Sequence, residues 1–596
     1  MRNMTFVVMC SIIGYSGNVN AAPILVEGLG KMEYRGYDSV GIATLNSGKL
    51  LIKKGIGKVA EVNASLGLRE MPGHLGIGHT RWATHGGVIE YNAHPHSACM
   101  SNIAVVHNGV IENYAELRQE LLTQGHVFKS ETDSEVIAHL LEQYFSKNND
   151  VKLAMINTCH RLTGSFAFVA IFNDSTLCAA RYDEPLIIGI SNEGYFISSD
   201  VLGFLNYTDS AIFLENRDIV MLEGSNLSLF DFDGKKVQRT NTQVAWELGD
   251  AEKGKYAHFT MKEIYEQNQT IFRSMQQSKE KLETFCNFLK GAREVFITGS
   301  GTSYHAALLA KYILSKYSRI RVEAVLSSEF QYSSNLLDKD SVIVAISQSG
   351  ETADVLQAVR SAIEKKAKVL SILNVPTSSL ARFSDCFLEV KCGPEVGVAA
   401  TKSFTSQLSI IYCVADIISD NKIGILTNGY EFSDAIKKTL QLESSVEEIA
   451  KKLKDARDIY LIGRSLHYPI CLEGALKIKE LAYIHAEGMA AGELKHGPLA
   501  LIDKSSVVII LHPFDSTYVD TLSNAHVIKS RGAKIIGVTD KEDQIYDYCI
   551  PLPSIRESLI PFLEVIPLQM LAYHLALYNN VDPDYPRNLA KSVTVR

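Results

Sequence analysis

The sequence lacks the patterns that mark several common classes of protein. Its ten cysteines include no Cys-x-x-Cys pair, which argues against a disulfide framework or a zinc site and favours a reducing cytoplasm. Acidic residues outnumber basic ones by 67 to 59, which argues against nucleic acid as the main partner. No stretch approaches the roughly 18 apolar residues that span a membrane. These absences predict a soluble, cytoplasmic protein.

The N-terminus carries a short apolar run, residues 6–13, that resembles part of a secretory signal. The run is very short for a signal, and the bulky Met9 stands where a small residue should precede a cleavage site. We therefore interpret it as a first β-strand.

The chain of 596 residues is long enough for about three or four domains. In residues 10–228, short apolar runs are separated by turns rich in glycine and asparagine, with a few helical segments between them. This pattern predicts an α+β sandwich of antiparallel sheets. The polar stretch 229–255 has no clear periodicity and precedes a helical segment, so we place a linker and connecting helix at 229–284.

From Arg293 onward the chain repeats itself at an offset of 164 to 166 residues. Three pairs of segments match in the same order: 293–299 with 457–463, 341–347 with 506–512, and 368–372 with 534–538. Apolar strands alternating with helices at one offset predict two copies of a parallel α/β domain of the flavodoxin-like class. We place these copies at 285–424 and 450–586, followed by a tail, 587–596.

The residues of one turn in the first copy favour binding of an anion. The apolar run 342–346 ends at Ser-Gln-Ser-Gly-Glu-Thr, residues 347–352, and a helix-compatible segment follows. Hydroxyl, amide and backbone N–H donors at a helix N-terminus favour a phosphate. The stretch is neither a Walker P-loop nor a dinucleotide fingerprint, so we expect a sugar phosphate, with an ordinary capped turn as the alternative. The second copy has His512–Thr517 at this turn, which predicts one phosphate cradle per chain, bordered by residues 299–303.

Four polar clusters gather in the first 109 residues, at 34–39, 78–86, 92–96 and 107–109. Their density predicts a site. Metal binding through His79, His85, His94 and His96 is an alternative, although the spacing matches no HExxH motif or helical i, i+4 pair. We predict no metal.

The second copy and the tail carry candidate proton-transfer groups. Lys477 and Glu480 are three residues apart and share a face of any helix, either as a solvated ion pair or as a buried acid–base pair. A carboxylate and an amine near a shielded histidine suit proton transfer at a sugar C1–C2 unit. Lys591 could form a Schiff base with an open-chain ketose, or it is an ordinary surface lysine.

The N-terminal clusters resemble a class II glutamine amidotransferase domain. The resemblance rests on Cys10, the runs 34–39, 81–85 and 107–109, and Thr132-Asp133. In that family an N-terminal cysteine is the nucleophile, and its own α-amine, with an ordinary pKa near ~7.7–8, takes the thiol proton. The implied roles are attack on the glutamine amide by Cys10, oxyanion donation by Asn108 and Gly109, carboxylate binding by Arg81, ammonium pairing by Asp133, and lining of the site by Trp82, Thr84, His85 and His94.

Two departures from the family pattern concern the nucleophile. Ser11 stands where the family has glycine, and nine residues precede Cys10. An N-terminal nucleophile must be exposed. Our hypothesis is that translation begins at Met9, which is then removed; if the extension persists, the glutaminase should be inactive.

From Cys10 to its end, the chain resembles the family of glutamine–fructose-6-phosphate aminotransferases. The resemblance implies that glutamine and fructose 6-phosphate give glutamate and glucosamine 6-phosphate without a cofactor, the first step of hexosamine synthesis, with Trp82 gating an ammonia channel. The residues implied to bind the sugar phosphate are Thr302, Ser303, Ser347, Gln348, Ser349, Thr352, Val398 and Ala590. The implied chemistry is ring opening by His496 from the partner subunit of a homodimer, imine formation by Lys591, and proton transfer by Glu480 with Lys477. Ala400 departs from a common serine.

Two alternatives remain. The first is another amidotransferase that uses the same kind of glutaminase domain, of the fructoselysine or phosphoribosyl type. Phosphoribosyl enzymes, however, lack the tandem repeat. A sugar-phosphate sensor that only binds is the other. The presence of Glu480, His496 and Lys591 favours an enzyme.

Overall fold

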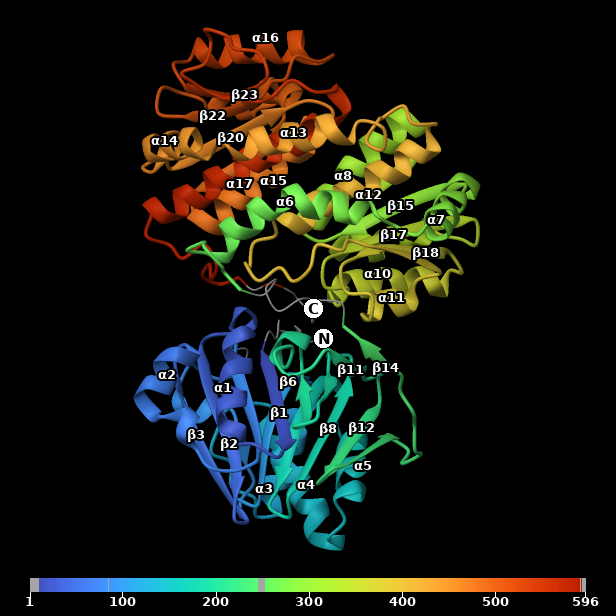
Figure 1. Cartoon of the computed structure of the whole chain (residues 1–596), viewed down its shortest axis with the longest axis vertical. Coiled ribbons are helices and arrows are strands. Elements are labelled where there is room, and N and C mark those ends of the chain that lie inside the picture. The colour runs from blue at the N-terminus through green and yellow to red at the C-terminus, as the bar shows by residue number, and fades with distance from the viewer. Residues whose placement is uncertain (1–9, 84, 245–251, 590, 592–596) are drawn as a thin grey trace. The chain divides into compact units, whose positions relative to one another are not determined.

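The computed structural model describes residues 10–83, 85–244, 252–589 and 591 (Figure 1). Residues 1–9, with the hypothetical start at Met9, and residues 84 and 590 lie outside the described residues. The described chain falls into two compact units, the first containing residues 10–83 and 85–244 and the second residues 252–589 and 591.

The first unit contains two antiparallel sheets. The eight-stranded sheet has the order β14-β11-β9-β10-β1-β4-β2-β3, and the six-stranded sheet has the order β13-β12-β8-β7-β6-β5. The strands of the first are β1 Ser11–Gly17, β2 Ser39–Asn46, β3 Lys49–Ile56, β4 Leu75–Arg81, β9 Ile187–Ile190, β10 Gly194–Ser198, β11 Ser210–Phe213 and β14 Asn241–Gln243. Those of the second are β5 His96–Ser97, β6 Ile103–Ile111, β7 Gly164–Phe172, β8 Thr176–Tyr182, β12 Asp218–Glu223 and β13 Asn226–Asp231. The predicted antiparallel sandwich is confirmed.

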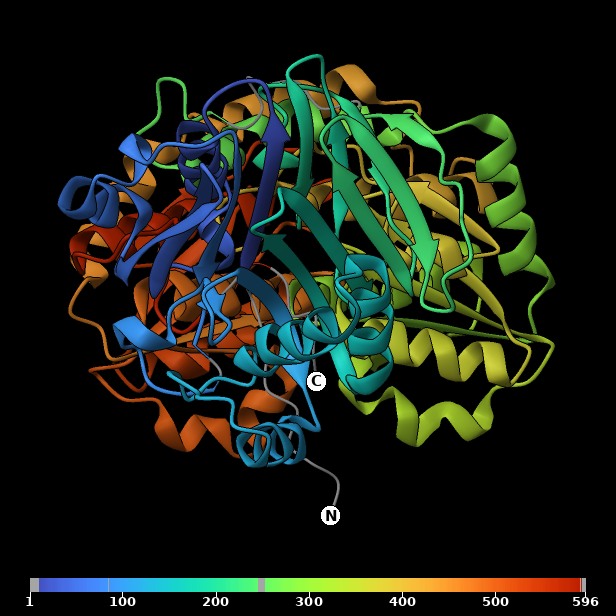
Figure 2. The same cartoon turned by 90° about the horizontal axis from the view of Figure 1, so that it is seen from below.

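The sheets of this unit enclose one core and carry helices outside. Strand β7 shows the arrangement: Ala167 and Val169 pack between the sheets, whereas Phe166 and Phe168 face the outer helices, as the two-residue period of a strand requires. The outer helices are α1 Ala21–Lys31, α2 Val59–Leu66, α3 Tyr114–Thr123, α4 Glu135–Asn148 and α5 Val151–Arg161. Helix α1 packs on β1 and β4, and α4 packs on β6. Figure 2 shows the chain from below.

Strand β14 and the end of β13 lie in the stretch 229–255, which the sequence indicates only as a polar connection. β14 is a three-residue strand at the edge of its sheet, and its residues are half-buried or exposed. An exposed edge strand needs no apolar alternation, so the sequence pattern does not reveal it.

The second unit contains two five-stranded parallel sheets with the same strand order, β16-β15-β17-β18-β19 and β21-β20-β22-β23-β24. The strands are β15 Glu294–Gly299, β16 Val322–Leu326, β17 Ser341–Ser347, β18 Lys368–Leu373 and β19 Cys386–Glu389 in the first copy, and β20 Asp458–Gly463, β21 His485–Ala490, β22 Val507–Leu511, β23 Lys534–Thr539 and β24 Tyr548–Pro551 in the second. The order is that of flavodoxin-like folds, which bind ligands where the direction of winding reverses, here beyond β15 and β17 and beyond β20 and β22. The predicted duplicated α/β fold is confirmed.

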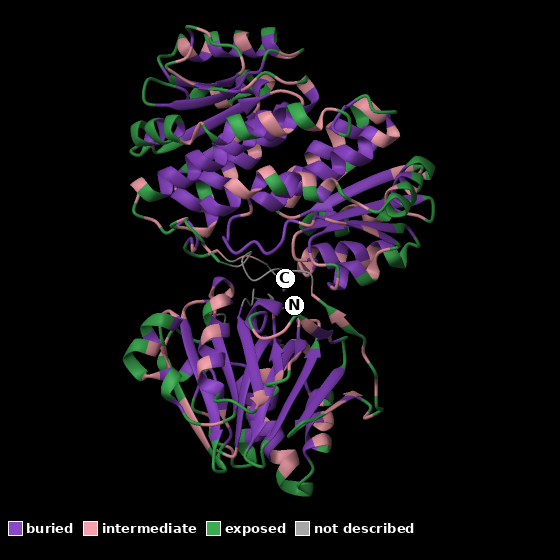
Figure 3. Cartoon of the chain, viewed as in Figure 1, coloured by how far each residue is buried: buried purple, intermediate pink, exposed green. Residues whose placement is uncertain are grey.

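The second unit carries long helices, and some of them join the two copies. They include α6 Phe259–Met275, α7 Lys279–Gly291, α8 Thr302–Ile313, α10 Ala353–Glu364, α12 Lys402–Ile418, α13 Gly429–Leu440, α14 Glu443–Leu453, α15 His467–Ala482, α16 Tyr518–Lys529 and α17 Ile560–Tyr578. Helix α15 packs on both α8 and α17, and α12 packs on α6 and α8. One apolar cluster therefore runs from the first copy into the second (Figure 3).

Helix α17 corrects one expectation. Residues 557–578 form a helix long and apolar enough to cross a membrane, contrary to the prediction that no such stretch exists. Its apolar window is entirely buried within the protein. A helix packed on every side has no polar face, so α17 has the composition of a membrane span while serving as a core helix.

Candidate active sites

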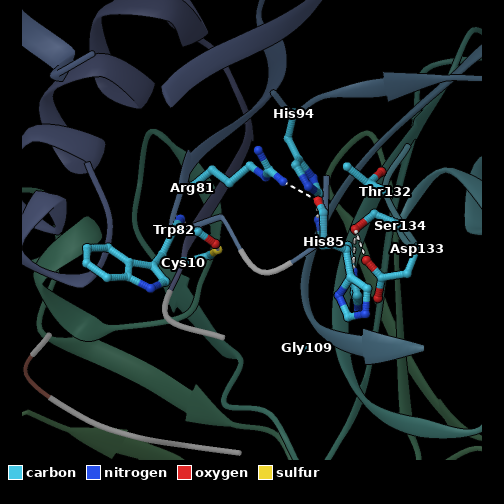
Figure 4. Close-up of a pocket in the computed structure, with 10 residues that line it drawn as sticks. Cys10, Arg81, Trp82, His85, His94, Gly109, Thr132, Asp133 and Ser134 are labelled. Carbon is cyan, nitrogen blue, oxygen red and sulfur yellow. Dashed lines mark hydrogen bonds between the residues drawn. The ribbon is translucent and has the colours of Figure 1, made fainter. Parts of the chain in front are cut away.

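Cys10 lies immediately before β1 and opens into a small polar cavity of the first unit. Its side chain is only 4% exposed, and its Sγ accepts a hydrogen bond of 3.3 Å from the Trp82 N–H at the end of β4. The cavity is lined by Cys10, Arg81, Trp82, His85, His94, His107, Gly109, Thr132, Asp133 and Ser134 (Figure 4). Residues predicted from separate polar clusters thus line one cavity together with Cys10.

The thiol of Cys10 is held in its protonated form by its surroundings. Burial raises its pKa to about 12, although the Trp82 N–H and the Arg81 guanidinium act in the opposite direction. Two histidines that line the cavity are poor proton acceptors, since burial lowers the pKa of His94 and lowers that of His107 to about 4. A nucleophilic thiolate at Cys10 therefore requires a base close to the sulfur.

The predicted oxyanion donors lie beside Cys10. The Asn108 side-chain amide donates to the Cys10 carbonyl at 3.0 Å, which leaves the second hydrogen of its NH₂ group for another acceptor. Gly109 has φ +119°, and a Cβ there would lie 2.1 Å from the Ser165 carbonyl oxygen. Only glycine fits at this position, which keeps its backbone open to the cavity.

Arg81 and Asp133 face the cavity with part of their bonding capacity in use. The Arg81 guanidinium donates to the carbonyls of His85, at 2.5 Å, and Gly87, at 3.2 Å, so it also fixes the loop that follows β4. Asp133 accepts the Ile111 N–H at 2.8 Å. These contacts orient a cation and an anion toward the same cavity, as binding of an amino acid requires.

The positions of the other residues that bear on this site are as follows. The His94 ring stacks on His79 at 4.0 Å between centroids, and Thr84 lies outside the described residues. Ser11, which departs from the family's glycine, is buried and donates to the Met32 carbonyl at 2.8 Å. His107 and Ser134, whose side chains lie 2.8 Å apart, line the cavity although sequence reasoning gave them no role.

In the second unit, the predicted strand, turn and helix are present at residues 341–364. The Ser347 Oγ accepts the Gly350 N–H at 3.0 Å and lies 3.2 Å from the Thr352 Oγ1, and α10 begins directly after Thr352. Gly350 has φ +69°, and a Cβ there would lie 2.0 Å from the Ser378 Oγ. Ser349 bonds within the turn, where its Oγ accepts the Glu351 N–H at 3.2 Å. Hydroxyl groups and a helix N-terminus thus meet at one end of the sheet.

The turn after β15 connects the first copy to the acid–base pair of the second. Thr302, the first residue of α8, accepts a hydrogen bond from Lys477 Nζ and donates one to Glu473, both at 3.1 Å. Lys477 Nζ also lies 2.5 Å from Glu480 Oε2. Although burial lowers the pKa of Lys477, the carboxylates of Glu480 and Glu473 raise it above its ordinary value. The lysine of the Lys477–Glu480 pair is therefore buried, and the pair is not a solvated ion pair on the surface.

Lys591 is buried by an ion pair that the sequence does not indicate. Its Nζ donates to Glu395 Oε2 at 2.5 Å and to the Gly397 carbonyl at 2.8 Å, and its side chain is 5% exposed. Burial raises the pKa of Glu395, but Lys591 and two hydrogen bonds from Ser403 lower it to about 2. The charge of Glu395 also raises the pKa of Lys477, so the two lysines share one electrostatic environment.

Of the remaining residues predicted for the sugar site, Val398 and Ser303 make hydrogen bonds within the protein, and His496 is exposed. The Val398 N–H donates to the Asp584 carbonyl at 3.3 Å, beside the Lys591 contacts, and Ser303 Oγ accepts from Gln407 at 3.1 Å. His496 is exposed at the end of the short helix Ala491–His496 and makes no hydrogen bond to another described residue of the site. Ala590 lies outside the described residues.

Sequence reasoning missed two buried carboxylates of this site. Glu473 holds both Thr302 and His305, whose Nδ1 lies 2.7 Å from Glu473 Oε2. It stands one turn before Lys477 on α15, a spacing that could have revealed it. Glu395 gives no such signal, since it lies in an irregular loop 196 residues before its partner Lys591.

The second copy has an ionic cluster at the position that corresponds to the phosphate turn. His467 lies between two carboxylates, with Nε2 2.9 Å from Asp515 and Nδ1 2.8 Å from Glu564. Burial lowers the pKa of His467, but Glu564 and Asp515 raise it to about 10. Protein side chains therefore pair with one another at this turn. One phosphate cradle per chain stays a prediction.

Comparison with known proteins relates both units to described families. A family model described as "Glutamine amidotransferase domain" matches residues 79–206, and one described as "SIS domain" matches residues 288–416 and 452–578. The chain is 44% identical to a glutamine–fructose-6-phosphate aminotransferase (isomerizing) of Pyrococcus horikoshii and 41% identical to one of Thermococcus kodakarensis. Each match covers 98% of this chain and 100% of the relative.

A solved structure resembles the second unit. The C-terminal domain of glucosamine-fructose-6-phosphate aminotransferase from Francisella tularensis is 34% identical, with a TM-score of 0.51. The match covers 56% of this chain and 99% of that domain.

Proposed function

The chain belongs to the family of glutamine–fructose-6-phosphate aminotransferases (isomerizing), and from this premise we propose that it converts glutamine and fructose 6-phosphate to glutamate and glucosamine 6-phosphate. The observation that supports this best is the presence of two kinds of reactive centre in one chain. A buried cysteine faces a cavity with an arginine and an aspartate, and a buried lysine–carboxylate system lies beside the hydroxyl-rich turns.

The first unit would release ammonia from glutamine. Arg81 would bind the α-carboxylate and Asp133 the α-ammonium group, which places the side-chain amide at Cys10. The Cys10 sulfur would attack the amide carbon, ammonia would leave, and water would hydrolyse the thioester to glutamate. Asn108 and Gly109 would donate to the oxyanion. The α-amine of Cys10, freed by removal of the residues before it, is the base that the buried thiol needs.

The second unit would bind and aminate the sugar. The turn at 347–352 would hold the phosphate, with Thr302 and Ser303 at its border. Lys591 Nζ would condense with C2 of the open-chain ketose with loss of water, and ammonia would then displace the lysine and leave nitrogen on C2. Glu480 would carry a proton from C1 to C2, which makes C1 the aldehyde, while Lys477 binds the hydroxyls.

His496 would assist ring opening from the partner subunit. Its exposure, and the lack of a hydrogen bond from it to another described residue of the site, support donation across the interface of a homodimer. We further propose that the glutaminase occupies residues 10–228, that the isomerase domains occupy 285–424 and 450–586, and that the enzyme works in the cytoplasm without a cofactor, nucleic acid or membrane.

The test is glucosamine 6-phosphate formation by the full-length protein, first with glutamine and then with ammonia as nitrogen donor. The proposal predicts product with both donors, and glutamate in equal amount with the first. Fructose 6-phosphate binding without product from either donor would contradict it and favour a sugar-phosphate sensor.

A further inference from the structure

Four side chains that could bind one metal ion lie together in the first unit, outside the Cys10 cavity. Cys99 follows β5, His126 lies in the connection between α3 and α4, and His139 and Glu142 stand three residues apart on one face of α4. His139 and Glu142 are buried, whereas Cys99 is exposed as a residue. None of the four has a role in the proposed reaction.

The ligand atoms of these residues have the spacing of a tetrahedral site. Cys99 Sγ lies 3.7 Å from His126 Nδ1 and 3.6 Å from His139 Nδ1. Glu142 Oε2 lies 3.3 Å from His126 Nδ1 and 4.0 Å from His139 Nδ1. Zinc bonds of about 2.0–2.3 Å at tetrahedral angles separate their ligand atoms by roughly 3.3–3.7 Å. A single ion can therefore contact all four with small adjustments.

Backbone groups hold the cysteine and the glutamate in this orientation. The Val127 N–H donates to Cys99 Sγ at 3.2 Å, a bond that stabilises a thiolate. The Cys99 N–H donates to Glu142 Oε2 at 3.2 Å, and the Met100 N–H donates to Glu142 Oε1 at 2.8 Å. Backbone N–H groups thus hold both the Cys99 sulfur and the Glu142 carboxylate.

His139 has the outer partner that metal-binding histidines typically have. Its Nε2, on the side of the ring away from the cluster, lies 3.5 Å from Glu135 Oε1. Glu135 in turn accepts hydrogen bonds from the Lys129 and Ser130 N–H groups, at 2.7 and 2.6 Å. In this geometry Nε2 is within ion-pair distance of Glu135 but makes no hydrogen bond. A small shift of the ring toward Glu135 would form that bond and fix the tautomer that leaves Nδ1 free to bind a metal.

We propose that Cys99, His126, His139 and Glu142 bind a zinc ion. One thiolate, two imidazoles and one carboxylate form a donor set that zinc accepts in fourfold coordination. Binding would release the Cys99 thiol proton to solvent. Because the protein supplies all four ligands, no position stays open for water, and the site is structural. Zinc at this cluster would overturn the prediction of no metal, which rested on other histidines and on the absence of Cys-x-x-Cys.

The site would stabilise one wall of the Cys10 cavity. The segment 126–135 begins at the ligand His126 and ends at Glu135, and it contains Thr132 and Asp133, which line that cavity. Glu135 also accepts the Ser130 hydroxyl at 2.6 Å, and Ser130 Oγ lies 3.0 Å from the Thr132 Oγ1. Loss of zinc should therefore weaken glutamine use. This consequence, unlike zinc binding itself, rests on the proposed function.

The test measures zinc in the full-length protein after incubation with Zn²⁺ and removal of excess metal. We expect about one zinc per chain in the native protein and in Cys549→Ser, whose half-buried cysteine lies in the other unit, and less than about 0.2 in Cys99→Ser. Replacement by Co²⁺ should give the thiolate charge-transfer band and intense visible bands of tetrahedral cobalt. The cobalt spectrum needs no variant and so does not depend on the folding of Cys99→Ser.

Two results would overturn the proposal. One is native protein with less than about 0.2 zinc per chain and no cobalt–thiolate band, which would make the cluster a hydrogen-bonded network only. The other is an undiminished zinc content in Cys99→Ser. If zinc binds but its chelation leaves glutamine-dependent activity unchanged, the site stands and the link to the Cys10 cavity is wrong. Absence of all activity would count against the proposed function and leave the zinc content as an independent result.

Discussion

Burial determines the chemistry of Cys10. The pKa of its thiol is raised to about 12, and burial lowers the pKa of His94 and His107, which line the same cavity, so both are poor bases at neutral pH. A free α-amine on the same residue avoids this difficulty, since its ordinary pKa lies near ~7.7–8 and it is fixed beside the sulfur by covalent bonds.

Replacement of Cys10 should separate the two half-reactions. We expect Cys10→Ala to lower glutamine-dependent synthesis by at least about a thousandfold, because the nucleophile is lost, while ammonia-dependent synthesis stays within about twofold of the native rate. Cys159→Ala, which changes a buried cysteine outside the cavity, is the matched control. A variant that loses both activities but remains folded would argue against separable sites.

Lys591 is the second residue whose surroundings suggest its role. We predict that borohydride added with fructose 6-phosphate reduces an imine and leaves the sugar phosphate attached to Lys591, which peptide mass spectrometry would detect. Lys591→Met should give no adduct, whereas Lys495→Met, an exposed lysine of the same unit, should still give it. An adduct that persists in Lys591→Met would exclude this lysine as the Schiff-base residue.

At the scale of elements, the phosphate turn and its counterpart in the second copy provide an internal comparison. Ser347→Ala removes a hydroxyl of the turn after β17, and we expect the KM for fructose 6-phosphate to rise roughly tenfold with the loss of one charge-assisted hydrogen bond. Ser516→Ala removes a hydroxyl from the corresponding turn after β22 and should leave this KM unchanged. Equal effects of the two changes would contradict the assignment of the phosphate to the first copy.

The His467 cluster should stabilise the second copy in a pH-dependent manner. The pKa of His467 in the folded protein, about 10, is above its ordinary value of 6.5. The proton on His467 therefore stabilises the fold fully below pH 6.5. That stabilisation is lost as the pH rises toward 10. We expect His467→Gln to lower the free energy of unfolding by roughly 3 kcal/mol at pH 6, because two buried carboxylates lose their cation.

Denaturant unfolding of native protein and His467→Gln across this pH range tests that expectation. The difference between the two proteins should shrink steadily from pH 6.5 to pH 10. A constant difference would show that His467 acts by packing and not by charge.

The elements that the sequence predicts well are those whose signal is local. The strand, turn and helix at 341–364 appear as predicted because an apolar run, a glycine and a helix cap are adjacent in sequence. The duplication was visible because each copy repeats its strands at one offset. By contrast, Glu395 pairs with Lys591, and Cys99 lies beside His139, only after distant segments fold together. The hydrophobic periodicity of a segment carries no information about such contacts with distant segments.

At the scale of the whole molecule, the state of the N-terminus determines whether the glutaminase can work. The proposed base exists only if the α-amine of Cys10 is free, so protein from its native host should begin at Cys10. Intact-mass measurement and N-terminal sequencing will show this. Retention of Met1 in an enzyme that uses glutamine would contradict the α-amine mechanism.

In the proposed reaction, one chain takes nitrogen from glutamine and places it on fructose 6-phosphate. The most direct measurement supplies glutamine labelled with ¹⁵N in its side-chain amide, together with fructose 6-phosphate and unlabelled ammonium, and analyses the sugar product. We expect glucosamine 6-phosphate that carries ¹⁵N, and an amount of glutamate equal to that of the labelled sugar. Glutamate formation with no labelled glucosamine 6-phosphate would contradict the proposed reaction.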